Sequence, residues 1–63
     1  MNNTKQEKQE VTYIVQTGDT LAKIARVYYG SEEHWGKVHR ANLGIIGQNP
    51  HELQVGLILT IPA

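Results

Sequence analysis

The side chains that could carry acid–base or nucleophilic chemistry are few in this chain of 63 residues. Asp19 could act as a general acid, but hydrolysis of a glycosidic bond needs a second carboxylate across that bond. The only acidic residue in the later loop is Glu52. The chain has no cysteine and a single serine, Ser31, so it lacks the residues of a nucleophilic triad. We therefore predict that the chain is not an enzyme.

Three histidines raise the question of a metal site. His34 and His39 lie five positions apart, so they do not share a helix face as an i, i+4 pair would. The third, His51, lies in a separate segment. We predict surface histidines, no metal site and no cofactor.

The segment Gln16–Leu21 has the residues of a tight turn into a helix. Gly18 allows a sharp reversal because it adopts positive φ at little cost. Asp19 is predicted to cap the helix by accepting hydrogen bonds from the N–H groups of Leu21 or Ala22. Its charge also suits the positive end of the helix dipole. Exposed polar groups at this point can bind a ligand, although a purely structural helix start explains the same residues equally well.

A predicted strand and a predicted helix flank this turn. Residues 11–15 are rich in β-branched side chains, which favour a strand. From Thr20 to about Tyr29 apolar residues recur at helical spacing, and Gly30 is expected to end the helix. The predicted buried stripe consists of Leu21, Ile24, Ala25 and Tyr28.

A second helix is predicted to begin after Ser31, its expected N-cap, and to end at Gly44. Its inner stripe contains Trp35, Val38 and Asn42. A sugar-stacking platform is the alternative role for Trp35, but we expect it to pack in the core against the first helix. We expect Asn42 to bond loop backbone, because a buried amide needs hydrogen-bond partners.

The order of elements is strand, helix, helix, strand. Residues 45–56 carry loop and turn signals, and residues 57–61 are predicted to form the last strand. We predict that the two strands pair antiparallel, with both helices on one face of the sheet. The fold class is therefore α+β, with a single domain at residues 11–63 after a polar arm at residues 1–10.

Charge and composition exclude several partners. Six basic and six acidic residues cancel, which argues against nucleic acid and against an anionic membrane surface. Residues 1–10 lack the apolar run of a secretory signal. If the chain is complete, we expect it in the cytoplasm, or released as part of a larger extracellular particle. If it is an excised fragment, this expectation does not hold.

Several short pieces occur in a specific order and spacing. They are Tyr13-x-Val15-x-x-Gly18-Asp19-Thr20-Leu21-x-x-Ile24-Ala25, Tyr28-Tyr29-Gly30, Trp35, Ala41-Asn42, Asn49-Pro50, Leu53, Gly56 and Leu59-x-Ile61-Pro62. Together they resemble the LysM (lysin motif) domain family over nearly all of the predicted domain. The resemblance implies a small β-α-α-β fold, which agrees with the pattern of elements.

The resemblance also implies a binding function. LysM domains typically bind glycans that contain N-acetylglucosamine, such as peptidoglycan or chitin. The implied groove lies between the first strand–helix loop and the loop before the last strand. Carried over by position, one wall is formed by Gly18, Asp19, Thr20 and Leu21, and the other by Asn49, Pro50, His51 and Leu53.

The chain departs from the family pattern in ways that reduce the sugar surface. Ala22 stands where many members have an aromatic or large residue. Both strands of a two-stranded sheet are edge strands, and apolar residues on them could form a protein-docking patch. Exposed apolar residues are also common without any role. The candidates for such a patch are Ile14, Ile45, Ile46, Leu57 and Ile58.

The sequence supports two functions from different classes. The first, which we favour from the sequence, is a structural adaptor in a phage tail-like contractile particle. There it would join tube or spike-hub subunits to sheath or baseplate proteins, as small LysM-only proteins do. The alternative is a module that attaches to the cell wall by binding peptidoglycan or another N-acetylglucosamine glycan.

Overall fold

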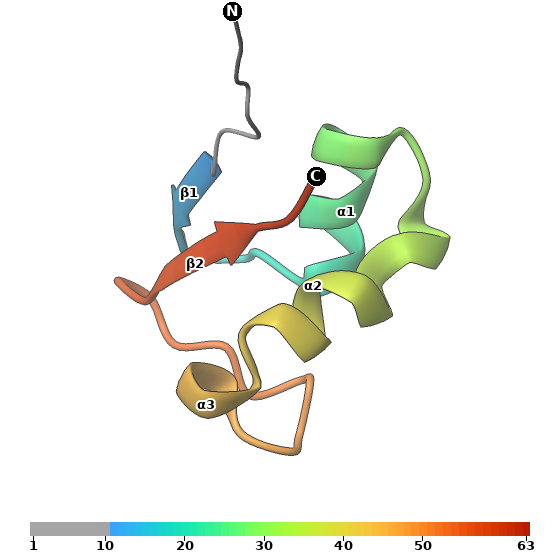
Figure 1. The fold of residues 1–63 in the computed structure, drawn as a ribbon. Helices are drawn as coiled ribbons and strands as arrows, with labels where there is room; N and C mark the ends of the chain where they lie inside the picture. The colour runs from blue at the N-terminus through green and yellow to red at the C-terminus, as the bar shows by residue number, and fades with distance from the viewer. Residues whose placement is uncertain (1–10) are drawn as a thin grey trace, which may run out of the picture.

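The computed structural model describes residues 11–63, and the predicted polar arm at residues 1–10 lies outside the described residues. The elements are β1 (Val11–Ile14), α1 (Leu21–Tyr29), the 3-10 helix η2 (Glu32–His34), α2 (Trp35–Ala41), α3 (Leu43–Ile46) and β2 (Ile58–Ile61). Strands β1 and β2 lie to one side of α1 and α2, and α3 lies below them (Figure 1). This arrangement confirms the predicted α+β fold, with both helical segments on one face of the sheet.

β1 and β2 form a two-stranded antiparallel sheet. Tyr13 lies opposite Leu59, and Ile14 lies opposite Ile58. Because side chains alternate between the faces of a strand, Tyr13 and Leu59 face the helices, where Leu59 is fully buried. Ile14 and Ile58 lie on the outer face, where more than half of each side chain is exposed. The sheet therefore has one buried face and one face open to solvent.

Helix α1 follows the predicted pattern except at its last stripe position. Gly30 ends the helix in a left-handed conformation with φ of 81°. Tyr28, predicted to be buried, is 38% exposed, and its ring stands edge-on to Tyr13 with centroids 6.1 Å apart. The other three stripe residues are buried: Leu21, Ile24 and Ala25.

The second helical segment differs from the prediction at its end. It begins as expected with Ser31, whose side chain accepts a hydrogen bond from the Glu33 N–H at 3.2 Å. Helix α2 ends at Ala41 with Asn42 as its C-cap, before the predicted end at Gly44. Gly44 instead lies inside the separate short helix α3, which ends at Gly47 with φ of 87°. A helical glycine costs only about 1 kcal/mol, which packing can offset. Ile46, predicted in a loop, is consequently helical and buried.

Asn42 joins this helical segment to the sheet. Its side-chain oxygen accepts from the Thr60 N–H, and its side-chain nitrogen donates to the carbonyls of Thr60 and Val38, each at 2.8 Å. The prediction that Asn42 bonds loop backbone is therefore wrong, because its distant partner is strand β2. The amide is 3% exposed, so all three bonds form away from water.

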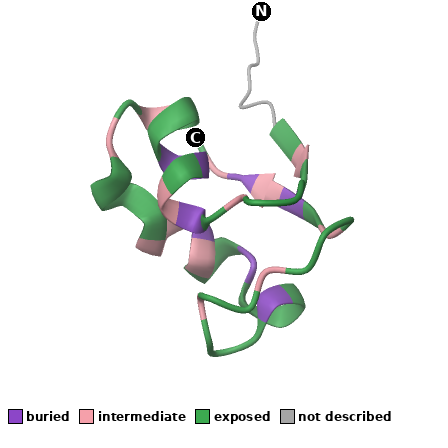
Figure 2. Cartoon of the chain, turned by 180° about the vertical axis from the view of Figure 1, so that it is seen from behind, coloured by how far each residue is buried: buried purple, intermediate pink, exposed green. Residues whose placement is uncertain are grey.

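The core lies between the sheet and the helices, as the buried stretches in Figure 2 show. Tyr13, Tyr29, Leu53 and Leu57 close its rim as partly buried residues. Within residues 11–63, no helix is long and apolar enough to cross a bilayer. The buried members are Val15, Leu21, Ile24, Val38, Ile46, Leu59 and Ile61.

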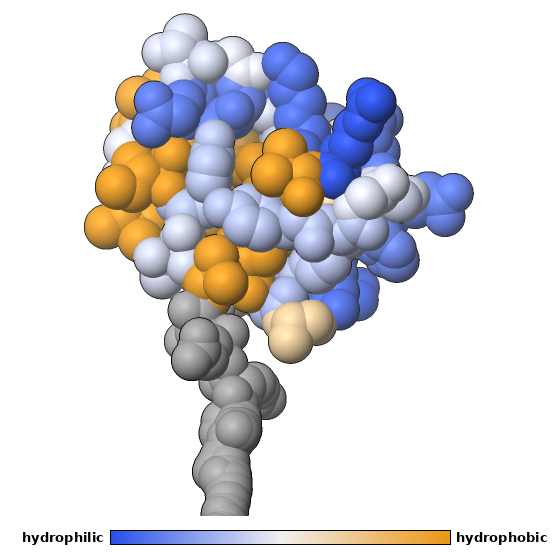
Figure 3. All heavy atoms as spheres, turned by 90° about the horizontal axis from the view of Figure 1, so that it is seen from above, coloured by the Kyte–Doolittle hydropathy of each residue, from blue (hydrophilic) through white to orange (hydrophobic). Residues whose placement is uncertain are grey.

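The predicted docking residues separate into two groups. Ile14 and Ile58 form an exposed cross-strand pair, and Ile45 is also exposed. Ile46 is 8% exposed and belongs to the core, and Leu57 packs against the core, so the prediction is wrong for Ile46 and weakened for Leu57. On the face seen in Figure 3, apolar side chains gather in separate patches divided by polar ones. Of the five candidates, only Ile14, Ile45 and Ile58 are fully in the exposed class.

Candidate functional site

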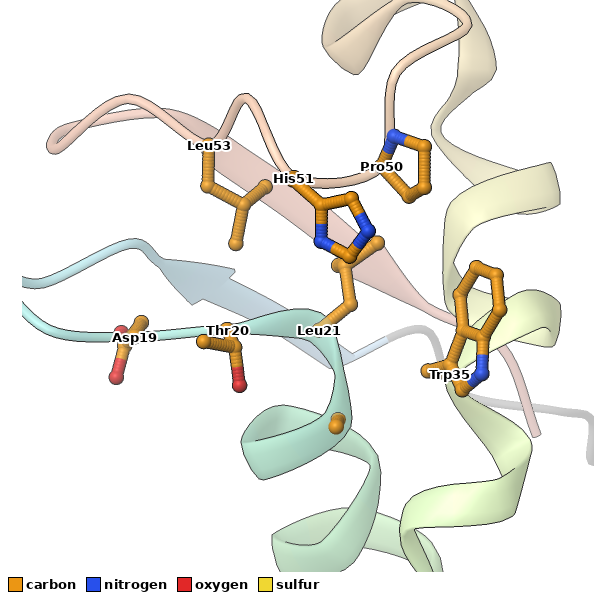
Figure 4. A pocket seen from close by; sticks show the side chains of 8 residues that line it. Asp19, Thr20, Leu21, Trp35, Pro50, His51 and Leu53 are labelled. Carbon is orange, nitrogen blue, oxygen red and sulfur yellow. The ribbon is translucent and has the colours of Figure 1, made fainter.

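A groove of about 430 Å³ lies between the β1–α1 turn and the loop before β2. Figure 4 shows Leu21 from α1 and Leu53 and His51 from the loop pointing into the same space. Trp35 and Pro50 lie at one end, and Asp19 and Thr20 lie at the other. The groove is lined by Asp19, Thr20, Leu21, Ala22, Trp35, Pro50, His51 and Leu53.

Most of the predicted wall residues meet at this groove, but two do not line it. Gly18 lies at positive φ and allows the chain to reverse before α1. Asn49 shapes the opposite loop, because its side-chain oxygen accepts from the His51 N–H at 2.9 Å and its carbonyl from the Glu52 N–H at 3.2 Å. Both residues therefore build the turns that present the groove residues.

Asp19 is not the N-cap of α1. Its Oδ2 accepts from the Tyr13 hydroxyl at 2.5 Å and from the Gln16 N–H at 2.7 Å. Thr20 caps the helix instead, accepting from the Lys23 N–H at 3.1 Å. The predicted cap was wrong because Asp19 lies one residue too early and Tyr13 offers its carboxylate a competing donor.

These bonds keep Asp19 ionised. The Tyr13 hydroxyl, and then the Gln16 N–H, hold the pKa of the Asp19 carboxyl below its usual range. The same bond to Asp19 raises the pKa of the Tyr13 hydroxyl. With one oxygen already holding two donors, this carboxylate is poorly placed to serve as a general acid.

The groove contains two residues outside the predicted walls, Trp35 and Ala22. The expectation that Trp35 packs in the core is wrong, because the side chain is 42% exposed and borders the groove. Trp35 lies in the first turn of α2, whereas Val38, one turn later, is the residue of this stripe that is fully buried. A small alanine in the first turn of α1, together with the single tryptophan of the chain, was the sequence signal that could have indicated an open aromatic end of the groove.

The histidines have separate surroundings. The His34 ring stands near Tyr29 with centroids 5.6 Å apart. The Nε2 of His39 lies 2.8 Å from the Gly47 carbonyl oxygen. His51 lines the groove. Among the residues that the structure describes, no group of three His, Cys, Asp or Glu side chains could hold a metal ion.

Comparison with protein families matches residues 13–62 to the LysM domain. Searches of curated proteins and of solved structures returned no match. LysM domains are non-catalytic binding modules that generally bind peptidoglycan or related glycans. Because the match spans almost the whole described chain and agrees with the β-α-α-β arrangement, this chain belongs to the LysM domain family.

Proposed function

We propose that this domain binds a glycan containing N-acetylglucosamine, such as a peptidoglycan chain, in the groove between the β1–α1 turn and the loop before β2. The observation that carries the proposal is the meeting of these two segments around an open space of about 430 Å³. A space of this size with mainly apolar walls and a few polar groups is typical of small-ligand sites.

The groove has a single acidic side chain and no lysine or arginine, so most of its wall suits an uncharged sugar. No lysine, arginine or glutamate lines it, and its single carboxylate, on Asp19, is engaged with Tyr13 and Gln16. Leu21 and Leu53 offer an apolar surface to the methyl group of an N-acetyl substituent. The His51 imidazole and the Thr20 hydroxyl can exchange hydrogen bonds with sugar hydroxyls.

A titration with N-acetylglucosamine oligomers, followed by amide chemical shifts, tests this proposal. We expect shifts at Leu21, Ala22 and Leu53. A matched pair of variants, His51→Asp and His34→Asp, changes one exposed histidine inside the groove and one outside it. Only the first should weaken binding. Absence of binding at millimolar oligomer, or equal effects of both variants, would contradict the proposal.

A second candidate function is the adaptor role in a contractile particle, and the free edge of strand β1 favours it. Residues opposite each other in an antiparallel pair alternate between bonded and non-bonded positions. Thr12 of β1 lies directly opposite Thr60 of β2. The N–H and C=O of Thr60 bond Asn42 and not Thr12, so the two threonines form a non-bonded pair. The N–H and C=O of Thr12 therefore point away from β2, to the open edge of β1. Asn42 thus covers part of the β2 edge, while within the described residues no other strand pairs with β1.

This open edge lies beside the exposed pair Ile14 and Ile58. Unpaired backbone groups next to an apolar surface suit an added strand from a tube, hub or sheath subunit. Direct binding should be tested with purified tube, hub and sheath proteins of a contractile particle from the same source. The double variant Ile14→Thr, Ile58→Thr should abolish such binding and leave glycan binding intact. Failure of all these purified proteins to bind would remove the adaptor role.

A further inference from the structure

We propose that Trp35 forms a separate stacking subsite at the α2 end of the groove, which takes the apolar face of a sugar ring. This inference rests on the proposed glycan function and extends it, because the subsite lies outside the two loops. It makes Trp35 a residue that determines which glycans bind and how long they must be.

The first observation is the position of the indole. Trp35 is the only tryptophan of the chain, and 42% of it is exposed although Leu59 and Val38 nearby in the core are fully buried. Figure 4 places its ring system opposite Pro50, at the end of the groove away from Asp19 and Thr20. A large aromatic surface is therefore presented to the groove instead of to the core.

The second observation is the space beside the ring. Ala22, in the first turn of α1, lines the same groove as Trp35. Its side chain is a single methyl group, which leaves room for a ligand at this end of the groove. A longer side chain at position 22 would extend into that room.

The third observation is the support behind the ring. His39 lies one turn after Trp35 on α2, with the two ring centroids 6.3 Å apart and the planes inclined by 32°. The His39 Nε2 is 2.8 Å from the Gly47 carbonyl oxygen, so this nitrogen carries the hydrogen and donates it. The imidazole is thereby held between α2 and the end of α3. A supported indole loses less freedom on binding, which favours affinity.

The chemistry of the ring selects the ligand. The face of an aromatic ring is electron-rich, and it attracts either C–H groups of positive character or a cation. A cation on the indole would be stabilised further by a neighbouring carboxylate, but the only carboxylate of the groove, on Asp19, lies at the opposite end from Trp35 (Figure 4). The C–H face of a β-linked pyranose, whose substituents are equatorial, suits the site better.

The intrinsic fluorescence of Trp35 reports on this subsite directly, because the chain has no other tryptophan. We expect N-acetylglucosamine oligomers to change the emission and to shift the indole N–H resonance, with affinity rising from short to longer oligomers. Trp35→Ala should weaken binding of a long oligomer by about tenfold while binding of a short one changes little. That dependence on length would not follow from a purely structural role.

A second pair of variants guards against a loss of folding in Trp35→Ala. Ala22→Leu should block the subsite and weaken long oligomers selectively, whereas Ala41→Leu, an exposed alanine outside the groove, should not. Circular dichroism confirms that each variant is folded. Tetramethylammonium serves as the cationic probe, and a stronger emission change with it than with sugars would overturn the choice of ligand.

The two proposals fail in different ways. Oligomer binding with shifts at Leu53, an unchanged Trp35 emission and equal affinity of Ala22→Leu would overturn the stacking subsite and leave glycan binding in place. Absence of any oligomer binding would overturn the proposed function and this inference with it.

Discussion

The two ends of the groove use their side chains in opposite ways. At the β1–α1 end, Asp19 is bonded to Tyr13 and Gln16, and Thr20 caps α1. At the α2 end, Trp35 is exposed and faces open space. The polar end therefore holds the fold together, while the aromatic end has surface left for a ligand. A polar group near a groove is available for binding only with the hydrogen-bonding capacity that the fold has not already used.

The largest effect on stability is expected at Asn42, a polar side chain whose hydrogen bonds all serve the fold. The stability losses of the other variants are compared with the loss at this residue. Asn42→Ala removes three hydrogen bonds and leaves the N–H and C=O of Thr60 without these partners. We expect a loss of about 3 kcal/mol in the free energy of unfolding, measured by urea denaturation.

Asn49→Ala is the control for Asn42. Asn49 is exposed, and its side chain bonds only the His51 N–H within the described residues. Its removal should cost less than about 1 kcal/mol. Equal losses for the two asparagines would show that burial of the Asn42 amide is not what makes it structural.

A smaller effect is expected at Gly18, which tests the structural role of the β1–α1 turn. Gly18 has φ of 87°, and nothing lies within 4 Å of a Cβ added there. The cost of Gly18→Ala is therefore backbone strain alone, about 1–2 kcal/mol. Gly36→Ala is the matched control, because Gly36 lies inside α2, has equal space and should gain about 0.5–1 kcal/mol.

Binding by Gly18→Ala sharpens the comparison of the two ends. If the turn serves mainly the fold, the folded fraction of this variant should bind oligomers nearly as well as the parent. A loss of affinity in fully folded Gly18→Ala larger than that of Trp35→Ala would reverse the roles assigned to the two ends.

The smallest effect is expected from the ionisation of Asp19. Its pKa is lowered in the folded state, so its stabilising contribution is complete above the ordinary pKa of aspartate. That contribution is lost as the pH falls through the lowered pKa. Thermal midpoints measured down this range should fall less steeply for Asp19→Asn than for the parent.

Tyr13→Phe provides a second test of the same bond. It removes the hydroxyl that contributes most to the shift at Asp19, so it should also reduce the acid dependence of stability. An acid dependence identical in the parent and both variants would show that this bond does not link pH to folding.

The fold could be predicted from the sequence because its signals are local. The β-branched run of β1, the apolar spacing of α1 and Gly30 each act within a few residues, and the structure confirms them. The end of the second helical segment could not be predicted in this way. Helix α2 stops earlier, at Ala41, where Asn42 bonds strand β2. Gly44 is a helix-breaking signal locally, but burial of Ile46 against the core favours a separate helical turn, α3, around it.

The site was predicted in outline, with its errors at residues whose partners are distant or in competition. Asp19 had two plausible local roles, and the position of Tyr13 decided between them. Trp35 fitted the buried stripe of its helix, yet the packing of Val38 left the indole at the rim. Periodicity identifies the side of a helix but not how far the core extends along it.

The sequence by itself determined the order of elements, the class of fold and the two segments that face each other across the groove. The order of elements and the fold class depend on local propensities, and the two facing segments follow from the resemblance to the LysM family. Only the tertiary structure decided that Asn42 bonds β2, that Asp19 is engaged by Tyr13 and that Trp35 borders open space. The physical reason is that hydrogen-bond partners and exposure depend on which distant surfaces meet, and that is settled only when the chain packs.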